Sequence, residues 1–270
     1  MKRLTIRLLC TASIFLCVAF STNAQPTEWE QKALAWEREI YAATSPHDHN
    51  RAVMGKVEAR KQQELYGEAL AELSRIYTYA LGDEELTTYY TQRALCGYLA
   101  GEYDLSLTTT EEARFYITDP EALSLLTLIE ALSAGEKGEW ERSERAAMQW
   151  LESQPDSEER KRQLAKLYDS SPKMRNPMVA WALNFIPGLG YFYAGEFGRG
   201  AISMLVSGAL ATFAVGEMVA GEWLSGWIVG CGSLSTPYLV GQERARMLTE
   251  QRNTRLLATH NDLLRNILLN

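Results

Sequence analysis

The chain has 270 residues, of which 46% are hydrophobic, and a formal net charge of −7. The charge is unevenly divided: residues 25–172 carry 28 acidic against 16 basic side chains, whereas residues 173–270 carry 6 against 8. A region with a net charge of −12 repels phosphate backbones, which argues against nucleic acid as its partner. The length and this division predict two structural units, one soluble and one in a membrane.

The first 24 residues have the pattern of a signal peptide. Three basic residues within the first seven precede an apolar run over residues 8–20, and residues 22–24 are short or small. Such a segment directs export, and we expect cleavage after Ala24. The alternative is an uncleaved membrane anchor, although residues 8–20 in a helix cover only about 20 Å of a hydrocarbon core of roughly 30 Å.

Cleavage would leave two cysteines, Cys96 in the acidic region and Cys231 in an apolar stretch. They lie in different predicted units, and neither belongs to a Cys-x-x-Cys pattern. We therefore expect two buried, unpaired thiols rather than a disulfide or a metal site.

The acidic region, residues 25–172, repeats itself in steps of 37 residues. The segments at 64–66, 101–103 and 138–140 each end on an aromatic residue, and small or apolar residues keep the same step elsewhere. These recurring positions are Val57, Ala94 and Ala131; Ala69, Ser106 and Ser143; and Ile76, Ala113 and Trp150. Small residues let paired helices approach closely, so each step predicts two helices with a turn before the aromatic residue. A further helix is expected around residues 27–43, and Ser170, Ser171 and Pro172 break the pattern.

These residues resemble the tetratricopeptide repeat family over roughly residues 50–157. The likeness is carried by Tyr90, Ala94, Gly101-Glu102-Tyr103-Asp104, Ala113, Ala131, Gly138-Glu139-Trp140 and Pro155. The step departs from the family's length of about 34 residues, and the first step lacks the turn glycine. A generic array of helical hairpins is the alternative. Both predict an all-α fold.

The resemblance implies a groove that binds a peptide or protein segment and is lined by the first helix of each pair. In this chain the corresponding positions are Thr88, Thr91, Leu95, Tyr98, Leu99, Leu125, Leu128 and Leu132. For Leu125, Leu128 and Leu132 the alternative interpretation is that they belong to the hydrophobic core and are covered by the next helix.

A helical transmembrane domain of two to three spans is predicted over residues 173–243. Three uncharged stretches, 176–195, 200–216 and 223–242, are each close to the length that crosses a bilayer. A soluble fold would need amphipathic helices to cover them, and only the tail after Gln242 is available. Within the last stretch, Gly226 and Gly230 form a Gly-x-x-x-Gly pattern that favours close helix packing.

The first uncharged stretch ends in the motif Pro187, Gly188, Gly190, Tyr193 and Gly195. Proline stops a helix, glycine permits left-handed backbone angles, and aromatic rings favour the headgroup region, so the motif predicts a tight interfacial turn. A phosphate-binding loop is excluded because no strand precedes the motif and no Lys-Ser/Thr follows it. Residues 176–245 resemble the two-transmembrane-helix domain family, although the histidine often found in its turn is absent. That resemblance implies an architecture and no chemistry.

The number of crossings decides where the basic residues lie. An exported repeat domain followed by three crossings places Arg199 and the group Arg244, Arg246, Arg252 and Arg255 inside the cell, as the positive-inside rule prefers. Two crossings, with residues 176–195 only at the interface, put both groups outside. We favour three crossings of the inner membrane, with the repeat domain facing the periplasm. The tail, residues 244–270, predicts an amphipathic helix that packs on the membrane or self-associates, so a homo-oligomer or a larger complex stays open.

No residue cluster specifies a reaction. His47, Asp48 and His49 could hold a metal, but a solvated helix start capped by Asp48 is the better interpretation. The apolar stretches lack the ionisable residues that carriers place within their spans, which argues against transport. We therefore expect no catalytic site, metal or cofactor. The predicted function is a membrane-anchored protein-binding or scaffolding protein; the alternative is an accessory or assembly subunit of a larger inner-membrane complex, for transport or protein insertion, that acts through its membrane domain.

Overall fold

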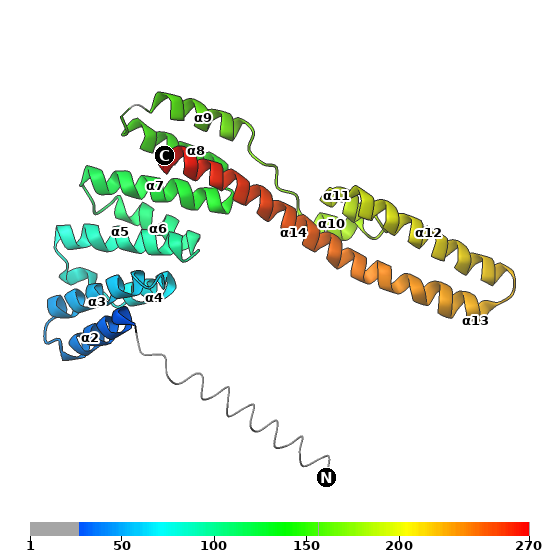
Figure 1. Cartoon of the computed structure of the whole chain (residues 1–270), viewed down its shortest axis with the longest axis horizontal. Coiled ribbons are helices and arrows are strands. Elements are labelled where there is room, and N and C mark those ends of the chain that lie inside the picture. Colours follow the sequence, from blue (N-terminus) through cyan, green and yellow to red (C-terminus); the bar gives the residue numbers. More distant parts are fainter. Residues whose placement is uncertain (1–26, 156, 270) are drawn as a thin grey trace, which may run out of the picture. The chain divides into compact units, whose positions relative to one another are not determined.

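The computed structural model of the chain describes residues 27–155 and 157–269 (Figure 1). Within these ranges the fold is all helical, without a strand, which confirms the predicted class. The chain divides into two units, residues 1–133 and 134–270, so the region predicted as one repeat domain contributes to both. The predicted signal peptide, residues 1–24, lies outside the described residues.

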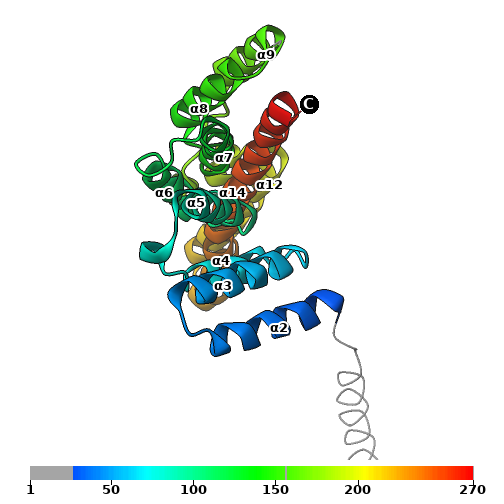
Figure 2. The same ribbon diagram turned by 90° about the vertical axis from the view of Figure 1, so that its left-hand side faces the viewer.

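The first unit is a succession of helices in which each helix from α2 to α6 contacts the next α-helix. Figure 2 shows α2 beside α3 and α3 beside α4. Its core is apolar and includes Val53, Val57, Leu73, Leu126 and Ile129. The helices are α2 (Glu28–Ala42), α3 (Pro46–Lys61), α4 (Tyr66–Leu73), the short η1 (Thr78–Ala80), α5 (Asp83–Leu99), α6 (Tyr103–Ala113) and α7 (Pro120–Lys137), which crosses the unit boundary.

Capping residues set the starts of the first two helices. Thr27 and Glu30 form a capping box at the start of α2, where the sequence predicts a helix. Ser45 caps α3: its hydroxyl accepts from the Asp48 backbone N–H at 3.1 Å and donates to the Asp48 carboxylate at 2.7 Å. The helix start was expected, but the cap is Ser45 and not Asp48.

The second unit holds the predicted membrane region and the tail. After α12 the chain reverses, and the following helical segments run back against α12. Both α10 and α11 pack on α14, whose length accounts for most of the return and for the whole tail. The elements are α8 (Trp140–Glu152), α9 (Glu158–Asp169), α10 (Pro177–Leu183), α11 (Leu189–Ala194), α12 (Phe197–Val219), α13 (Trp223–Ser225), the π-helical η2 (Gly226–Cys231) and α14 (Gly232–Leu269).

The stretch 176–195, expected as the first of three spans, does not form one continuous helix. The stretch 176–195 forms α10, of seven residues, and α11, of six, with a turn between them. Seven helical residues extend about 10 Å, which is a third of a hydrocarbon core of roughly 30 Å. Pro187 does follow the end of α10, as expected, but it separates two short helices that lie against α14 rather than two spans.

One turn joins consecutive helices at five places, and only three of them were recognised in the sequence. A residue with positive φ ends each first helix, and the next residue donates its backbone N–H to the carbonyl five positions earlier at 2.8–3.0 Å. This bond is the signature of the Schellman motif. An aromatic residue then begins the next helix. The positive-φ residues are Glu64, Gly101, Gly138, Gly195 and Gly221.

Five positions after each positive-φ residue lies a small, buried residue. It brings together the two helices that the turn joins. In α6, the Ser106 hydroxyl donates to the Ala94 carbonyl at 2.9 Å. A Cβ on Gly226 would lie 2.9 Å from the Ala214 carbonyl oxygen, which is also twelve positions earlier. The same small-residue contact therefore forms in the first unit and in the apolar helices of the second. The five positions are Ala69, Ser106, Ser143, Gly200 and Gly226.

Candidate functional site

Apolar side chains cover the outside of the hairpin that α12 forms with the segment after it. Within the described residues, α12 is the one helix long and apolar enough to cross a membrane, and only 11% of its apolar window is buried. Such a surface marks a membrane or protein contact, since soluble proteins do not leave it bare. The exposed residues include Ile202, Leu205, Val215, Val219, Trp223, Leu224, Trp227, Ile228 and Leu239.

The tail packs within its own unit, against the end of α7 and against α9. Arg265 forms an ion pair with Glu136 at the end of α7. Leu264 is fully buried, and a Cβ on Gly135 would lie 3.1 Å from its side chain. Helix α9 contacts α14 as well. The sequence predicted a tail on the membrane or on a second copy; Leu264 and Leu268 are instead buried within this unit, while Leu263 and Leu269 stay exposed.

His260 is buried where the tail meets α8 and α9. Its ring lies 4.4 Å from that of Trp140 and 5.2 Å from that of Tyr168, measured between centroids. Burial lowers the pKa of His260, because the imidazolium form loses its hydration there. Burial also raises the pKa of Tyr168 to about 12, while its hydroxyl shares a hydrogen bond of 2.6 Å with Ser143.

The glycines of the turn motif serve close packing at the base of the hairpin. Gly188 has a φ of +101°, and its N–H donates to the buried Asn184 side chain at 3.1 Å. Gly190 lies so close to α10 and α14 that a Cβ would meet the Ala180 carbonyl oxygen at 2.3 Å and the Ala245 Cβ at 2.9 Å. A third motif residue, Tyr193, contacts the segment before α10.

That segment forms hydrogen bonds with Tyr193 through Arg175 and Asn176. The Tyr193 carbonyl accepts from the Arg175 guanidinium, and the Tyr193 hydroxyl accepts from the Asn176 N–H at 3.2 Å. Gly195 has a φ of +93° and ends α11. Gly226 packs on α12 as described, and Gly230 lies in η2, with surroundings outside what the structure describes.

The predicted groove residues differ in their exposure. Leu99 on α5 and Leu125 on α7 are exposed by 43% and 40%, whereas Leu128 and Leu132 are buried. Burial of these two agrees with the alternative of plain core for the α7 positions. The half-buried residues Thr91, Leu95 and Tyr98 lie on α5, and the last two pack against the core of the first unit.

A cavity of about 240 Å³ opens between α3 and α5, beside this predicted groove. Its walls are mixed, with Met54, Ile76 and Leu81 as apolar members and Arg51 and Glu85 as charged ones. These two helices are the first members of neighbouring helix pairs, which is where the resemblance implies that a peptide binds. Thr88, the first of the expected groove positions, also lines the cavity.

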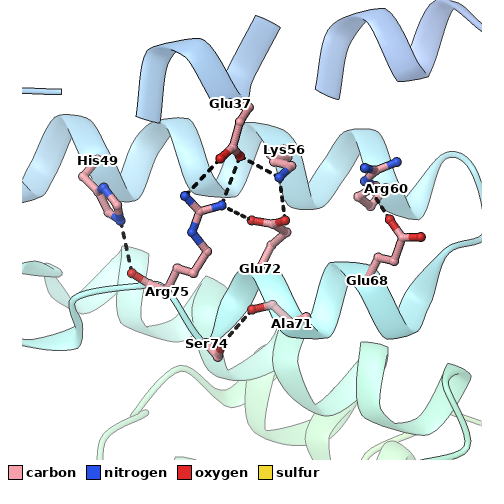
Figure 3. A network of polar contacts seen from close by, with 9 residues as sticks. All are labelled: Glu37, His49, Lys56, Arg60, Glu68, Ala71, Glu72, Ser74 and Arg75. Atoms are coloured by element: carbon pink, nitrogen blue, oxygen red, sulfur yellow. Dashed lines mark hydrogen bonds and ion pairs between the residues drawn. The ribbon is translucent and has the colours of Figure 1, made fainter. Parts of the chain in front are cut away.

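A network of ion pairs fixes the segment that walls this cavity (Figure 3). Lys56 lies 2.6 Å from both Glu37 and Glu72, and Arg75 bridges the same two carboxylates. The hydrogen bonds from Arg75 and Lys56 lower the pKa of Glu37. The network therefore joins α2, α3 and α4, and it sets the position of Ile76, which follows Arg75.

The histidines near the start of α3 contact protein groups and not each other. His47 lies 3.3 Å from the Glu85 carboxylate, and His49 contacts the Arg75 carbonyl at 3.2 Å. Within residues 27–155 and 157–269 no group of three His, Cys, Asp or Glu side chains is placed to hold a metal.

Comparison with protein families, with curated proteins and with solved structures finds no match to this chain.

Proposed function

We propose that the chain is a membrane-anchored binding protein, exported by its N-terminal segment and held at the inner membrane by the hairpin of α12 and residues 223–242. The exposed apolar surface of this hairpin is the observation that carries the proposal. The helical-repeat region lies on the periplasmic side and binds a protein segment. The cavity between α3 and α5 supports the binding role, since it lies beside exposed groove positions.

Two crossings then follow from the packing of the tail. Because α14 ends against α7 and α9, the residues before and after the hairpin share one side. Helix α12 has 23 residues and extends about 35 Å, which suffices to cross the hydrocarbon core. The tip of the hairpin, near Glu222, lies on the opposite side. An exported first unit places Arg199 and the basic residues of the tail outside.

Labelling of single introduced cysteines with a membrane-impermeant maleimide in intact spheroplasts tests this arrangement. We expect Glu39→Cys and Thr254→Cys to be labelled, and Glu222→Cys to be labelled only after permeabilisation. Labelling of Glu39→Cys without Thr254→Cys would restore three crossings. Recovery of the protein in the soluble fraction after carbonate extraction would contradict the proposed membrane anchor.

Photo-crosslinking in the native host tests the binding role. A photoreactive residue at Leu99 or Leu125 should capture one discrete protein, whereas Tyr41 on α2, which is more exposed than either, serves as the control. Capture only from Arg244, at the base of the hairpin, would favour the alternative of an accessory subunit that acts through its membrane domain. Equal capture from Leu99, Leu125 and Tyr41 would contradict a groove.

A further inference from the structure

An apolar cavity of about 500 Å³ lies between α12 and α14, on the side of the hairpin near its base. Ile202, Val206 and Leu210 line it from α12, and Val240 lines it from α14. Arg199 belongs to the same face of α12, one turn before Ile202. The lining therefore changes from cationic to apolar over roughly 16 Å of helix, from the start of α12 toward the middle of the membrane.

A second cavity of about 480 Å³ shares Arg199 with the first and lies on the polar side of it. Arg252 and Arg255 line it from α14, and Glu196 and Gln251 are its other charged or strongly polar members. Three guanidinium groups thus face one carboxylate. The backbone N–H groups at the start of α12 add partial positive charge at this point.

The guanidinium group of Arg252 is incompletely paired. Its Nη1 atom is buried and has no hydrogen-bond partner within the described part of the chain. A buried donor that is left unsatisfied costs about 1–3 kcal/mol, and more when it is charged. Arg244 and Arg255 also form no ion pair with a described carboxylate, while Arg199 lies 3.7 Å from Glu196. An anion in this cavity would supply the missing acceptors.

We propose that the base of the hairpin binds one anionic phospholipid. Its phosphate and headgroup contact Arg199, Arg252 and Arg255, and one acyl chain follows Ile202, Val206 and Leu210 along α12. The inference rests on the membrane anchoring proposed above and adds a ligand to it. Charge complementarity and the continuity of the two cavities at Arg199 select a lipid, because a free anion would leave the apolar cavity empty.

The orientation of the basic residues agrees with this ligand. With two crossings and an exported first unit, the arginines lie on the outer side, where the positive-inside rule disfavours them. Contact with an anionic headgroup offsets this preference, since each basic residue near an anionic surface contributes about 1 kcal/mol of attraction.

Native mass spectrometry of the full-length purified protein tests the proposal. The protein is reconstituted with equal amounts of phosphatidylglycerol and phosphatidylcholine and then released into detergent. We expect one retained phosphatidylglycerol and no retained phosphatidylcholine. Arg252→Gln and Arg255→Gln should each reduce retention about five-fold or more. Arg162→Gln on α9 removes an exposed guanidinium of the same unit and should retain the lipid as the native chain does.

The outcomes separate this proposal from the anchor. Equal retention of both lipids, or unchanged retention in both variants, would overturn the lipid site while the anchor stands. Failure of the protein to insert into the lipid at all would contradict the proposed membrane anchor. Arg255 is exposed, so Arg255→Gln should keep the native circular dichroism spectrum even if Arg252→Gln unfolds. Inorganic phosphate that displaces the lipid at low millimolar concentration would identify a free-anion site and refute the lipid.

Discussion

Replacing Gly190 by alanine places a methyl group in a space that has no room for it. The new Cβ would lie 2.3 Å from the Ala180 carbonyl oxygen, 2.7 Å from the Asn184 Cβ and 2.9 Å from the Ala245 Cβ. All three are backbone or Cβ atoms, so rotation of a side chain cannot relieve the overlap. Helices α10 and α14 must move apart from α11.

The expected cost follows from overpacking, which destabilises cores by about 1–3 kcal/mol and sometimes more. Each kcal/mol lowers the Tm of a chain of this size by about 2–4 °C. Gly198→Ala is the matched control, because Gly198 lies in the first turn of α12 with no atom within 4 Å of an added Cβ. Both variants change the unfolded chain equally, so the difference between their Tm values reports the overlap.

Thermal unfolding in detergent, followed by far-ultraviolet circular dichroism, measures the difference between the two Tm values. Gly190→Ala should unfold at least about 2 °C below Gly198→Ala. Equal Tm values for the two variants would refute the close packing of α10, α11 and α14 at Gly190.

Three further results are expected from buried groups of the two units. Because burial lowers the pKa of His260, its contribution to stability is complete above its ordinary pKa of about 6.5 and is lost as the pH falls below it; Tm should fall more steeply between about pH 7.5 and pH 5 in the native chain than in His260→Phe. Lys56→Ala removes one of the two cations that bridge Glu37 and Glu72, leaving Arg75, and should cost about 2–3 kcal/mol of unfolding free energy in urea titrations. Burial raises the pKa of the Cys96 thiol to about 11, so a thiol reagent should modify it only after unfolding.

Each of these results has a control in the same unit. Thr259→Ser, one position before His260 and exposed, should keep the native pH profile, and an unchanged profile in His260→Phe would contradict the role of burial. Lys32→Ala removes an exposed ion pair with Glu28 and should cost less than about 1 kcal/mol. Cysteine introduced at Thr254 should react at once; equally fast modification of Cys96 in the folded chain would show that it is accessible.

The helices of the acidic region, residues 25–172, were predictable because their turns follow a strict step. Gly101 and Gly138 each precede a glutamate and an aromatic residue, and the same letters occur at Gly195 and Gly221. Gly195 was predicted as part of the membrane turn motif but not as this repeated turn, and Gly221 was not predicted as a turn, because their spacing is not 37 residues. A search for the turn itself, with a small residue five positions after each glycine, finds all four.

The tail and the number of crossings could not be obtained from the sequence. The sequence shows that residues 176–195 are uncharged. It does not show that Asn184 is buried and accepts a hydrogen bond from the Gly188 N–H. Likewise Leu264 and Leu268 predict an apolar helix face without saying what covers it. Contacts between residues more than 100 positions apart, such as Arg265 with Glu136, set the packing of the tail. The base of the hairpin was missed for the same reason, since Arg199 and Arg252 meet only after the chain reverses.

Helix α14 runs without a break from Gly232 to Leu269. Its 38 residues extend roughly 57 Å, with one end beside α12 and the other against α7 and α9. A rod of this length acts as a lever: each degree by which the hairpin tilts moves the distal end by about 1 Å. A bilayer that becomes thinner and tilts the hairpin would therefore press on or pull at the packing around His260. In the membrane arrangement proposed above, this one helix would link the thickness of the membrane to the packing of the tail.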